Sequence, residues 1–220
     1  LYSGKFVNEF IIDPIQGGAG TSLNMNINEV IANRANEILG FSKGEYYPIH
    51  PNDHVNMGQS TNDVIPTAAS LTAYELLNGC IEKLIKLSYE FNIKAEEFTD
   101  VIKMGRTEMQ DAVPISLGSE FKAFSMAIGR DVKRLESVKD SLLEVNLGGT
   151  AVGTGITANE NYIDSVVLEL SNIFDEHIIQ SSNLVDGTQN LDKYAEVSSQ
   201  LKVCAVNISK IAGDLILMSS

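Results

Sequence analysis

The sequence predicts an all-α protein, a long-helix bundle, and three stretches carry that prediction. Residues 62–98 and 117–145 repeat apolar side chains in steps of three and four, the spacing of one helix face. Residues 194–218 have the most regular seam, made of Tyr194, Val197, Leu201, Cys204, Ile208, Ile211, Leu215 and Met218. Such seams are typical of helices that pack lengthwise against one another.

The first part of the chain contains one shorter predicted helix. Residues 1–16 are expected to be irregular, with Pro14 as a breaker. A helix is expected from about Ser22 to Leu39, ending near Gly40. Residues 41–61 hold two glycines and two prolines and are expected to form a loop.

The order of the remaining elements follows from caps and breakers. The first long helix is expected to start at Asn62-Asp63, since either side chain can cap it and Pro66 falls in its first turn. A loop-like connector follows around Gly105 and Pro114. The second long helix is expected to break at the glycine-rich stretch 147–155. A helix over 160–174 and a loop at Asp186-Gly187 precede the last helix.

Charge and composition limit the classes of partner. The formal net charge of −13 leaves no basic surplus to meet phosphates, so neither nucleic acid nor an anionic membrane is expected. No apolar run approaches the length of a membrane span. Cys80 and Cys204 lie among apolar residues and are expected to be buried, reduced thiols of a cytoplasmic protein. Further apolar residues such as Val203, Val206 and Ile216 lie off the main seam, which indicates helix-to-helix oligomerisation.

Three polar loops carry the functional hypothesis. They span 17–22, 58–63 and 105–111, and each is expected to open a helix. Free N–H groups at helix starts, together with nearby hydroxyls, form good seats for carboxylates. The sequence therefore favours a small anionic substrate held where several segments converge.

Structural explanations compete with this hypothesis at each loop. Thr21 or Ser22 could simply cap a helix, although the five polar residues 59–63 exceed what a cap requires. Arg106 could pair with Asp111, and Glu108 could be a solvated charge. The glycines of 148–155 are expected to allow close backbone approach.

The histidines and cysteines suggest no metal or nucleophile site. His50 and His54 have a spacing that suits a metal, but Pro51 lies between them and no third ligand is nearby, so both are expected to be ordinary loop residues. His177 stands apart from both. No Ser-His-Asp set, Cys-x-x-Cys pair or dinucleotide fingerprint is present.

Four motifs in order resemble the aspartase/fumarase superfamily. They are GGAGTSLNMNINEVIANR (17–34), HPNDHVNMGQSTND (50–63), MGRTEMQDAVP (104–114) and GGTAVGTG (148–155). The similarity extends over nearly the whole chain. NMGQSTN (56–62), EVNLG (144–148) and DGTQN (186–190) resemble the aspartate ammonia-lyase branch more than the class II fumarase branch.

The resemblance implies a reaction and a set of binding residues. The reaction would be reversible deamination of L-aspartate to fumarate and ammonia. Thr21, Ser60 and Thr61 would hold the β-carboxylate, and Asn62 and Thr107 the α-carboxylate and amino end. Removal of a proton beside a carboxylate builds an aci-carboxylate, whose charge the hydroxyls and helix starts would stabilise. The resemblance also implies a homotetramer, no organic cofactor and no catalytic metal, although divalent ions activate some members.

Two departures from the family pattern matter. Glu108 stands where other members carry His or Gln, and it is expected to line the site by contacting the substrate ammonium, by being protonated or by turning away. The general base, a serine in a mobile loop, would lie beyond Ser220 in the family pattern. No catalytic residue is therefore assigned in this chain, and the segment alone is not expected to turn over aspartate.

The predicted domains follow from the same resemblance. Residues 1–60 would be the C-terminal part of an N-terminal domain, and residues 61–220 a central helical-bundle domain that stops before the serine loop. Because the chain starts at Leu1 and ends within a helical pattern, we expect an internal part of a longer subunit. Two alternatives remain open, a class II fumarate hydratase and a non-catalytic helical oligomerisation module.

Overall fold

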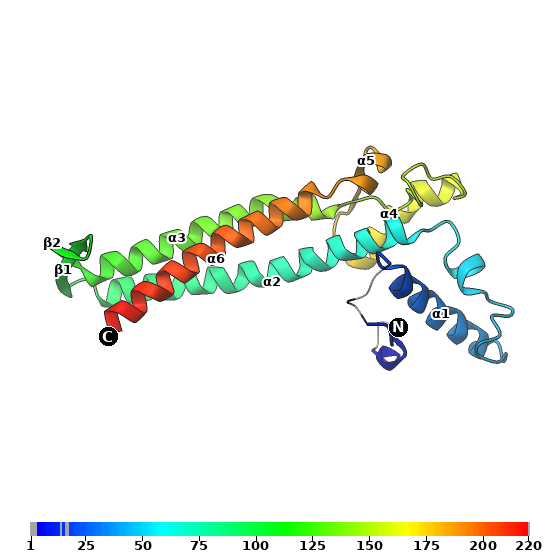
Figure 1. The fold of residues 1–220 in the computed structure, drawn as a ribbon, viewed down its shortest axis with the longest axis horizontal. Coiled ribbons are helices and arrows are strands. Elements are labelled where there is room, and N and C mark those ends of the chain that lie inside the picture. Colours follow the sequence, from blue (N-terminus) through cyan, green and yellow to red (C-terminus); the bar gives the residue numbers. More distant parts are fainter. Residues whose placement is uncertain (1–3, 14, 16–17, 220) are drawn as a thin grey trace. The chain divides into compact units, whose positions relative to one another are not determined.

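The computed structural model describes residues 4–13, 15 and 18–219. Pro14, predicted as a breaker, and Gly17, predicted to begin the first polar loop, lie outside these residues. The described chain forms two compact units (Figure 1). The first unit contains the described residues up to Leu71 together with Leu143–Asn190, and the second contains Thr72–Leu142 and the described part of Leu191–Ser220. The predicted division at residue 60 concerns the complete subunit and stays a prediction.

Three long helices make up most of the second unit, as predicted. Helix α2 (Thr61–Glu97) begins in the first unit and continues into the second, where it lies beside α3 (Leu117–Lys139) and α6 (Asp192–Ser219) (Figure 1). The core consists of apolar side chains at the predicted seam positions, including Ile81, Leu84, Ile128, Leu135, Val197, Cys204 and Ile211. Four phenylalanines of α2 and α3, Phe91, Phe98, Phe121 and Phe124, pack with ring centroids 5.4–6.2 Å apart. The fold class is confirmed.

A buried polar contact sets the register between α3 and α6. The Asp131 side chain is 1% exposed, and both of its carboxylate oxygens accept from Asn207 Nδ2 at 2.9 Å. Arg134 forms an ion pair with the same carboxylate at 2.5 Å. A charge buried this deeply requires such partners, so sliding either helix by a turn would leave it unpaired.

The predicted connector after α2 is a β-hairpin, so the loop prediction was wrong there. Strands β1 (Ile102–Thr107) and β2 (Gln110–Ser116) pair antiparallel, with an irregularity between Met104 and Arg106. Gly105 fills this irregularity because a Cβ there would lie 2.8 Å from the Val113 carbonyl oxygen. The third polar loop therefore forms a strand pair and its turn, and does not open a helix.

The first unit combines short helices around the start of α2. It contains η1 (Val7–Glu9), α1 (Thr21–Ile38), a π-helical turn η2 (Pro51–Val55), α4 (Glu160–Phe174) and α5 (Leu184–Gln189). Helix α4 has the predicted bounds. Helix α5 replaces the loop predicted at Asp186-Gly187, because Asn183 caps it by accepting from Val185 N and Asp186 N.

The predicted second long helix ends earlier than its apolar pattern suggests. After Lys139 the chain forms a 3₁₀ turn η3 (Asp140–Leu143) and then strand β3 (Glu144–Val145). Strand β3 pairs in parallel with β4 (Ile179–Gln180). The same apolar side chains, Leu142 and Val145, are buried in this strand-like path, which is why periodicity alone could not place the end.

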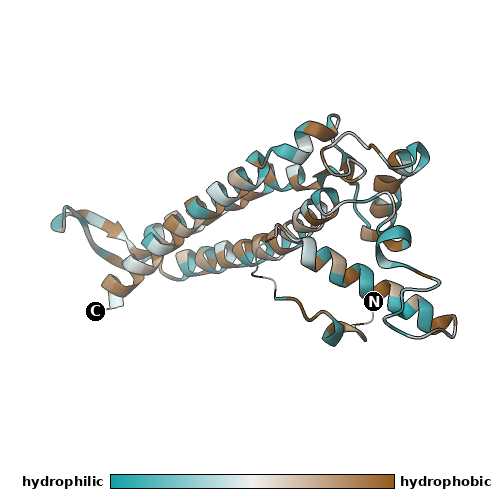
Figure 2. Cartoon of the chain, turned by 45° about the vertical axis from the view of Figure 1, so that its right-hand side comes forward, coloured by the Kyte–Doolittle hydropathy of each residue, from teal (hydrophilic) through white to brown (hydrophobic). Residues whose placement is uncertain are grey.

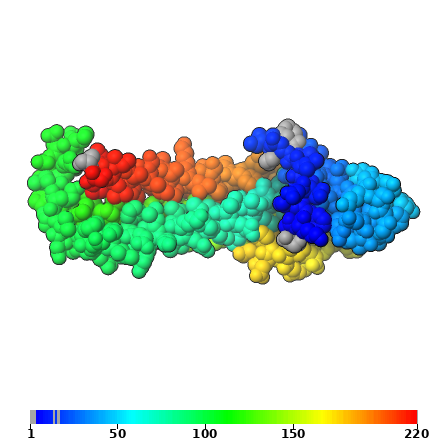
Figure 3. Space-filling view, turned by 90° about the horizontal axis from the view of Figure 1, so that it is seen from below, coloured from blue at the N-terminus to red at the C-terminus, as the bar shows by residue number. Residues whose placement is uncertain are grey.

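Apolar side chains also lie on the outer faces of the second unit, which confirms the prediction of helices with two apolar faces. On α2, Ile85 and Tyr89 are 50% and 63% exposed, and on α6, Val206 and Leu217 are each 61% exposed. Figure 2 shows brown, hydrophobic segments alternating with polar ones along these helices, and Figure 3 shows α2 and α6 side by side on one face. No helix among the described residues has the length and hydropathy that a membrane crossing requires.

Leu135→Ala tests the core of the second unit. Leu135 is fully buried on α3, so its truncation leaves a cavity and is expected to lower the free energy of unfolding by about 2–5 kcal/mol. Glu136→Ala, an exposed neighbour on the same helix, is expected to change it by less than about 0.5 kcal/mol. Urea unfolding of both variants measures the difference, and equal effects would contradict this core assignment.

Candidate functional site

The first turn of α2 is organised by a reciprocal cap. The Ser60 hydroxyl accepts from the backbone N–H of Asn62 at 3.2 Å, and the Asp63 carboxylate accepts from the backbone N–H of Ser60 at 2.9 Å. This arrangement is a capping box with Ser60 at the N-cap position. The helix therefore begins at Thr61, one residue earlier than predicted, and Ser60 already has a structural role.

Asp63 joins this cap to the glycine-rich loop. Its side chain is fully buried, and its second oxygen accepts from Thr150 N at 2.9 Å and from Gly148 N at 3.3 Å. Burial raises the pKa of the Asp63 carboxyl, and the backbone N–H groups around it oppose that rise. The carboxylate is thus shared between the helix start and the loop, although sequence reasoning considered it only as a cap.

The glycine-rich loop permits close backbone approach, as predicted. Gly153 has a φ of 86°, and a Cβ there would lie 2.4 Å from the Leu184 carbonyl oxygen. Only glycine fits both conditions. Asn146, at the start of the loop, donates to the Asn62 carbonyl oxygen and to the Thr188 hydroxyl, each at 3.0 Å. The loop is therefore fixed to both α2 and α5.

The Asn62 side chain is oriented by the same loop. Its Nδ2 donates to the Ala151 carbonyl oxygen at 2.7 Å, while the residue remains exposed. A carbonyl oxygen can only accept, so the amide nitrogen must face the loop and Oδ1 must face away from it. Asn62 therefore presents an acceptor oxygen, which suits an ammonium group.

The start of α1 lies against the start of α2. Gly20 is the N-cap of α1, with φ at 86°, and a Cβ there would lie 3.0 Å from Ile65 Cγ2 of α2. Among the described residues no side-chain cap of α1 is formed, so the exposed Thr21 does not have the capping role that the competing structural explanation required. Helix starts leave backbone N–H groups without intrahelical partners.

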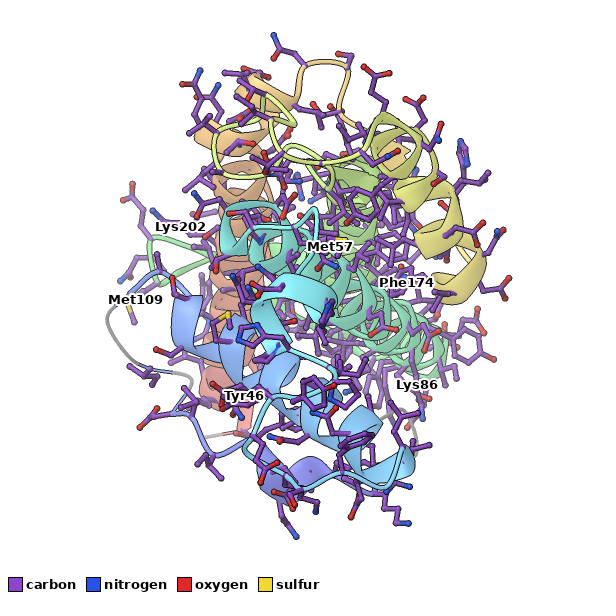
Figure 4. The ribbon with its side chains drawn as sticks, turned by 90° about the vertical axis from the view of Figure 1, so that its right-hand side faces the viewer. Tyr46, Met57, Lys86, Met109, Phe174 and Lys202 are labelled. Carbon is purple, nitrogen blue, oxygen red and sulfur yellow. The ribbon has the colours of Figure 1, made fainter. Side chains whose placement is uncertain are left out.

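A buried amide network holds the two helix starts together. Asn24 and Asn28, both 4% exposed on α1, donate from Nδ2 to Asn56 Oδ1 at 3.2 and 3.1 Å. Asn24 Nδ2 also donates to the Thr61 hydroxyl oxygen at 3.2 Å. Asn56 follows η2 and leads through Met57, which is labelled in Figure 4, to the start of α2. The network therefore reaches a predicted binding residue.

Tyr162 of α4 flanks this region. Its ring would contact a Cβ at Gly58, since the Cδ1 distance is 3.5 Å. Burial, together with the negative charge of Asp63, raises the pKa of Tyr162 to about 12. The phenol is therefore a neutral group near neutral pH.

Thr107 and Glu108 lie at the turn of the hairpin, in the second unit. Thr107 pairs with Gln110, and Glu108 and Met109 adopt left-handed backbone with φ of 50° and 62°. Both turn residues are exposed, and Met109 extends outward in Figure 4. Two consecutive left-handed residues are the geometry that a tight two-residue hairpin turn requires, although side chains of this size adopt it at some cost. Arg106 faces Asp111 in the ladder, but the described residues show no ion pair between them.

The histidines near η2 stabilise the chain locally. His50 Nδ1 accepts from Asn52 N and Asp53 N, and His54 Nδ1 accepts from His50 N at 2.9 Å. Within residues 4–13, 15 and 18–219, no group of three or more His, Cys, Asp or Glu side chains could hold a metal ion. Cys80 and Cys204 are free thiols; Cys204 is buried, as predicted, and Cys80 is half-buried. Burial raises the pKa of the Cys204 thiol.

The six predicted binding residues thus fall into two groups. Thr21, Ser60, Thr61 and Asn62 belong to the first unit, where α1 and α2 start, and Thr107 and Glu108 belong to the second. Sequence reasoning missed Asn24, Asn56 and the dual role of Asp63. A signal existed, because Asn24, Asn28 and Asn36 recur at core spacing on α1, where buried amides require partners.

In the first unit, two helix starts carry hydroxyl groups, an arrangement typical of seats for small anions. Long helices dominate the second unit. Residues 1–220 match the model of a family described as lyase, and the chain belongs to this lyase family.

Aspartate ammonia-lyases are among the relatives that this chain resembles over its whole length. The chain is 54% identical over 220 residues to an aspartate ammonia-lyase of Bacillus subtilis and 46% identical to one of Helicobacter pylori. The matched region is 100% of this chain but 46% and 47% of the two relatives. The chain therefore spans about half the length of these curated relatives.

A cobalt-bound fumarate lyase:delta crystallin from Brucella melitensis superposes with a TM-score of 0.94 at 49% identity, over 99% of this chain and 47% of that one. A class II fumarase from Schistosoma mansoni superposes with a TM-score of 0.88 at 32% identity, over 100% and 49%.

Asp63→Asn tests the link between α2 and the glycine-rich loop. The amide would turn an NH₂ group toward backbone N–H donors, so we expect the free energy of unfolding to fall by about 3 kcal/mol. Asp164→Asn, at an exposed position of α4, is the matched control and is expected to change it by less than about 0.5 kcal/mol. A chemical denaturation series decides, and an unchanged midpoint for Asp63→Asn would rule out the link.

Proposed function

We propose that the complete subunit carrying this chain is an aspartate ammonia-lyase, which removes ammonia from L-aspartate to give fumarate in a reversible reaction. The observation that carries the proposal is the paired start of α1 and α2, where Thr21 and Thr61 keep hydroxyls that no cap uses. The names of the relatives at 46–54% identity support the same substrate.

The proposed chemistry needs donors for one carboxylate. Abstraction of a proton from the carbon beside the β-carboxylate places a second negative charge on its oxygens. Hydroxyls of Thr21, Ser60 and Thr61, with the positive ends of the two helix dipoles, would stabilise that charge as it develops. The protein carries a net charge of −13, so the attraction must come from these local donors.

The other end of the substrate needs an acceptor and further donors. The Oδ1 atom of Asn62 points away from Ala151 and would accept from the substrate ammonium. The Thr107 hydroxyl would donate to the α-carboxylate, and the adjacent Glu108 carboxylate would accept from the ammonium. Because Thr107 and Glu108 lie in the other compact unit, we propose that they complete the site of a neighbouring subunit.

We further propose that the subunits form a homotetramer. The exposed apolar residues of α2 and α6, including Ile85, Tyr89, Val206 and Leu217, support this proposal since apolar faces of that extent are favourable only when covered. We propose that the reaction requires no organic cofactor and no catalytic metal, with divalent cations acting at most as activators. We place the enzyme in the cytoplasm, where Cys80 and Cys204 would remain thiols.

Thr61→Val and Thr107→Val test the substrate assignment in the complete subunit. Each removes one donor, so kcat/KM for L-aspartate is expected to fall about 100-fold, with the melting temperature little changed. Thr72→Val, an exposed threonine of α2, is the matched control and should retain activity. Fumarate formation is followed spectrophotometrically, with L-malate as the alternative substrate. Turnover of malate alone would favour a fumarate hydratase, and no turnover of either would favour a non-catalytic oligomerisation module.

Charged substitutions on α2 test the assembly. Ile85→Glu combined with Tyr89→Glu places two charges on the exposed apolar face and should convert the tetramer to smaller species. Leu168→Glu on α4 likewise places a charge at an exposed apolar residue, but it should leave the assembly intact. Light scattering after size-exclusion chromatography gives the mass of each. An unchanged mass for the double variant would refute this use of the α2 face.

A further inference from the structure

We propose that Asn24 is a positioning residue, which makes the Thr61 hydroxyl a hydrogen-bond donor toward the substrate carboxylate. This inference rests on the proposed function, because it names how one group of that site is prepared. Asn24 itself is 4% exposed and would act through its hydrogen bond to the Thr61 hydroxyl oxygen.

The first step concerns the direction of one hydrogen bond. The Asn56 Oδ1 atom accepts hydrogen bonds from Nδ2 of both Asn24 and Asn28. The amide nitrogen of Asn24 therefore faces Asn56. The same nitrogen lies 3.2 Å from Thr61 Oγ1. An amide NH₂ group can only donate, and its two hydrogens serve these two acceptors.

The second step concerns the proton of Thr61. A hydroxyl has one hydrogen and accepts through its lone pairs. Because Thr61 Oγ1 accepts from Asn24, its own hydrogen must point elsewhere. Thr61 is half-buried at the start of α2, where the N–H groups of Asn62 and Asp63 already donate to Ser60. The Thr61 hydrogen remains as a donor toward a carboxylate at the positive end of the helix.

The third step is energetic. A hydroxyl that already accepts a hydrogen bond is a stronger donor, since hydrogen bonds in a chain polarise one another. The network also fixes the hydroxyl before the substrate arrives, so no rotor has to be ordered as charge develops. Asn24 should therefore contribute to kcat more than to KM, because the added charge exists only in the transition state.

Asn24→Asp in the complete enzyme reverses the polarity of this contact with little change in shape. The new carboxylate would accept a hydrogen bond from the Thr61 hydroxyl, so this hydroxyl would no longer donate to the substrate. We expect kcat for L-aspartate to fall about 100-fold with KM changed only a few-fold. Asn28→Asp is the matched control because Asn28 shares the acceptor Asn56 but makes no hydrogen bond with Thr61 among the described residues, and its kcat should fall at least tenfold less.

A double variant separates positioning from general damage. Asn24→Asp should reduce kcat little further in a Thr61→Val background, because the hydroxyl on which it acts is already absent. If either buried carboxylate prevents folding, as judged by circular dichroism, Asn24→Ala and Asn28→Ala give the same comparison. Equal losses of kcat for the variants at Asn24 and Asn28 would overturn the inference. So would a double variant of Asn24 and Thr61 whose loss of kcat is the product of the two single losses.

The proposed function fails in a different way. Full activity in Thr61→Val would remove Thr61 from the site and overturn both the assignment and the inference. A large loss in Thr61→Val with no effect of Asn24→Asp would overturn the inference alone. Absence of aspartate turnover by the unmodified enzyme would overturn the proposed function itself.

Discussion

The carboxylate of Asp63 is the constraint on which the first unit depends. One oxygen closes the capping box at the start of α2, and the other accepts from the backbone of Gly148 and Thr150. A buried carboxylate is favourable only when such donors surround it, so the helix start and the loop must fold together. That coupling keeps Ser60, Thr61 and Asn62 in fixed positions relative to the loop.

A second polar element, the amide face of α1, extends this rigidity. Asn24 and Asn28 hold Asn56, while Asn36 exchanges hydrogen bonds with the backbone of Ile49 at 2.8 and 2.9 Å. A helix that buries amides in place of leucines gives up apolar contact and gains directional contacts. Such a face fits a site in which hydroxyl directions matter. The second unit differs, because its core is mostly apolar apart from the Asp131 contact, and its outer faces carry apolar side chains too.

Much of the fold followed from the sequence, and the errors have identifiable causes. Seams of steps three and four located α2, α3 and α6, because long amphipathic helices have a strong period. The hairpin was missed because its turn residues, Glu108 and Met109, are not the Asn-Gly type that signals a two-residue turn. Helix α5 was missed because Asp186-Gly187 is typical of a turn. In the site, hydroxyl-rich helix starts were visible from the sequence, but Asn24 and Asp63 act through partners 37 and 87 residues away, which no local pattern predicts.

The proposed function requires that hydroxyls from the starts of α1 and α2 and from the hairpin turn surround one dicarboxylate. The most direct measurement is a crystal structure of the complete assembly with bound fumarate. We expect the hydroxyl oxygens of Thr21, Thr61 and Thr107, from the same or neighbouring subunits, to lie about 3 Å from the oxygens of a single fumarate. Fumarate bound elsewhere, with these three hydroxyls out of reach of any common ligand, would contradict it.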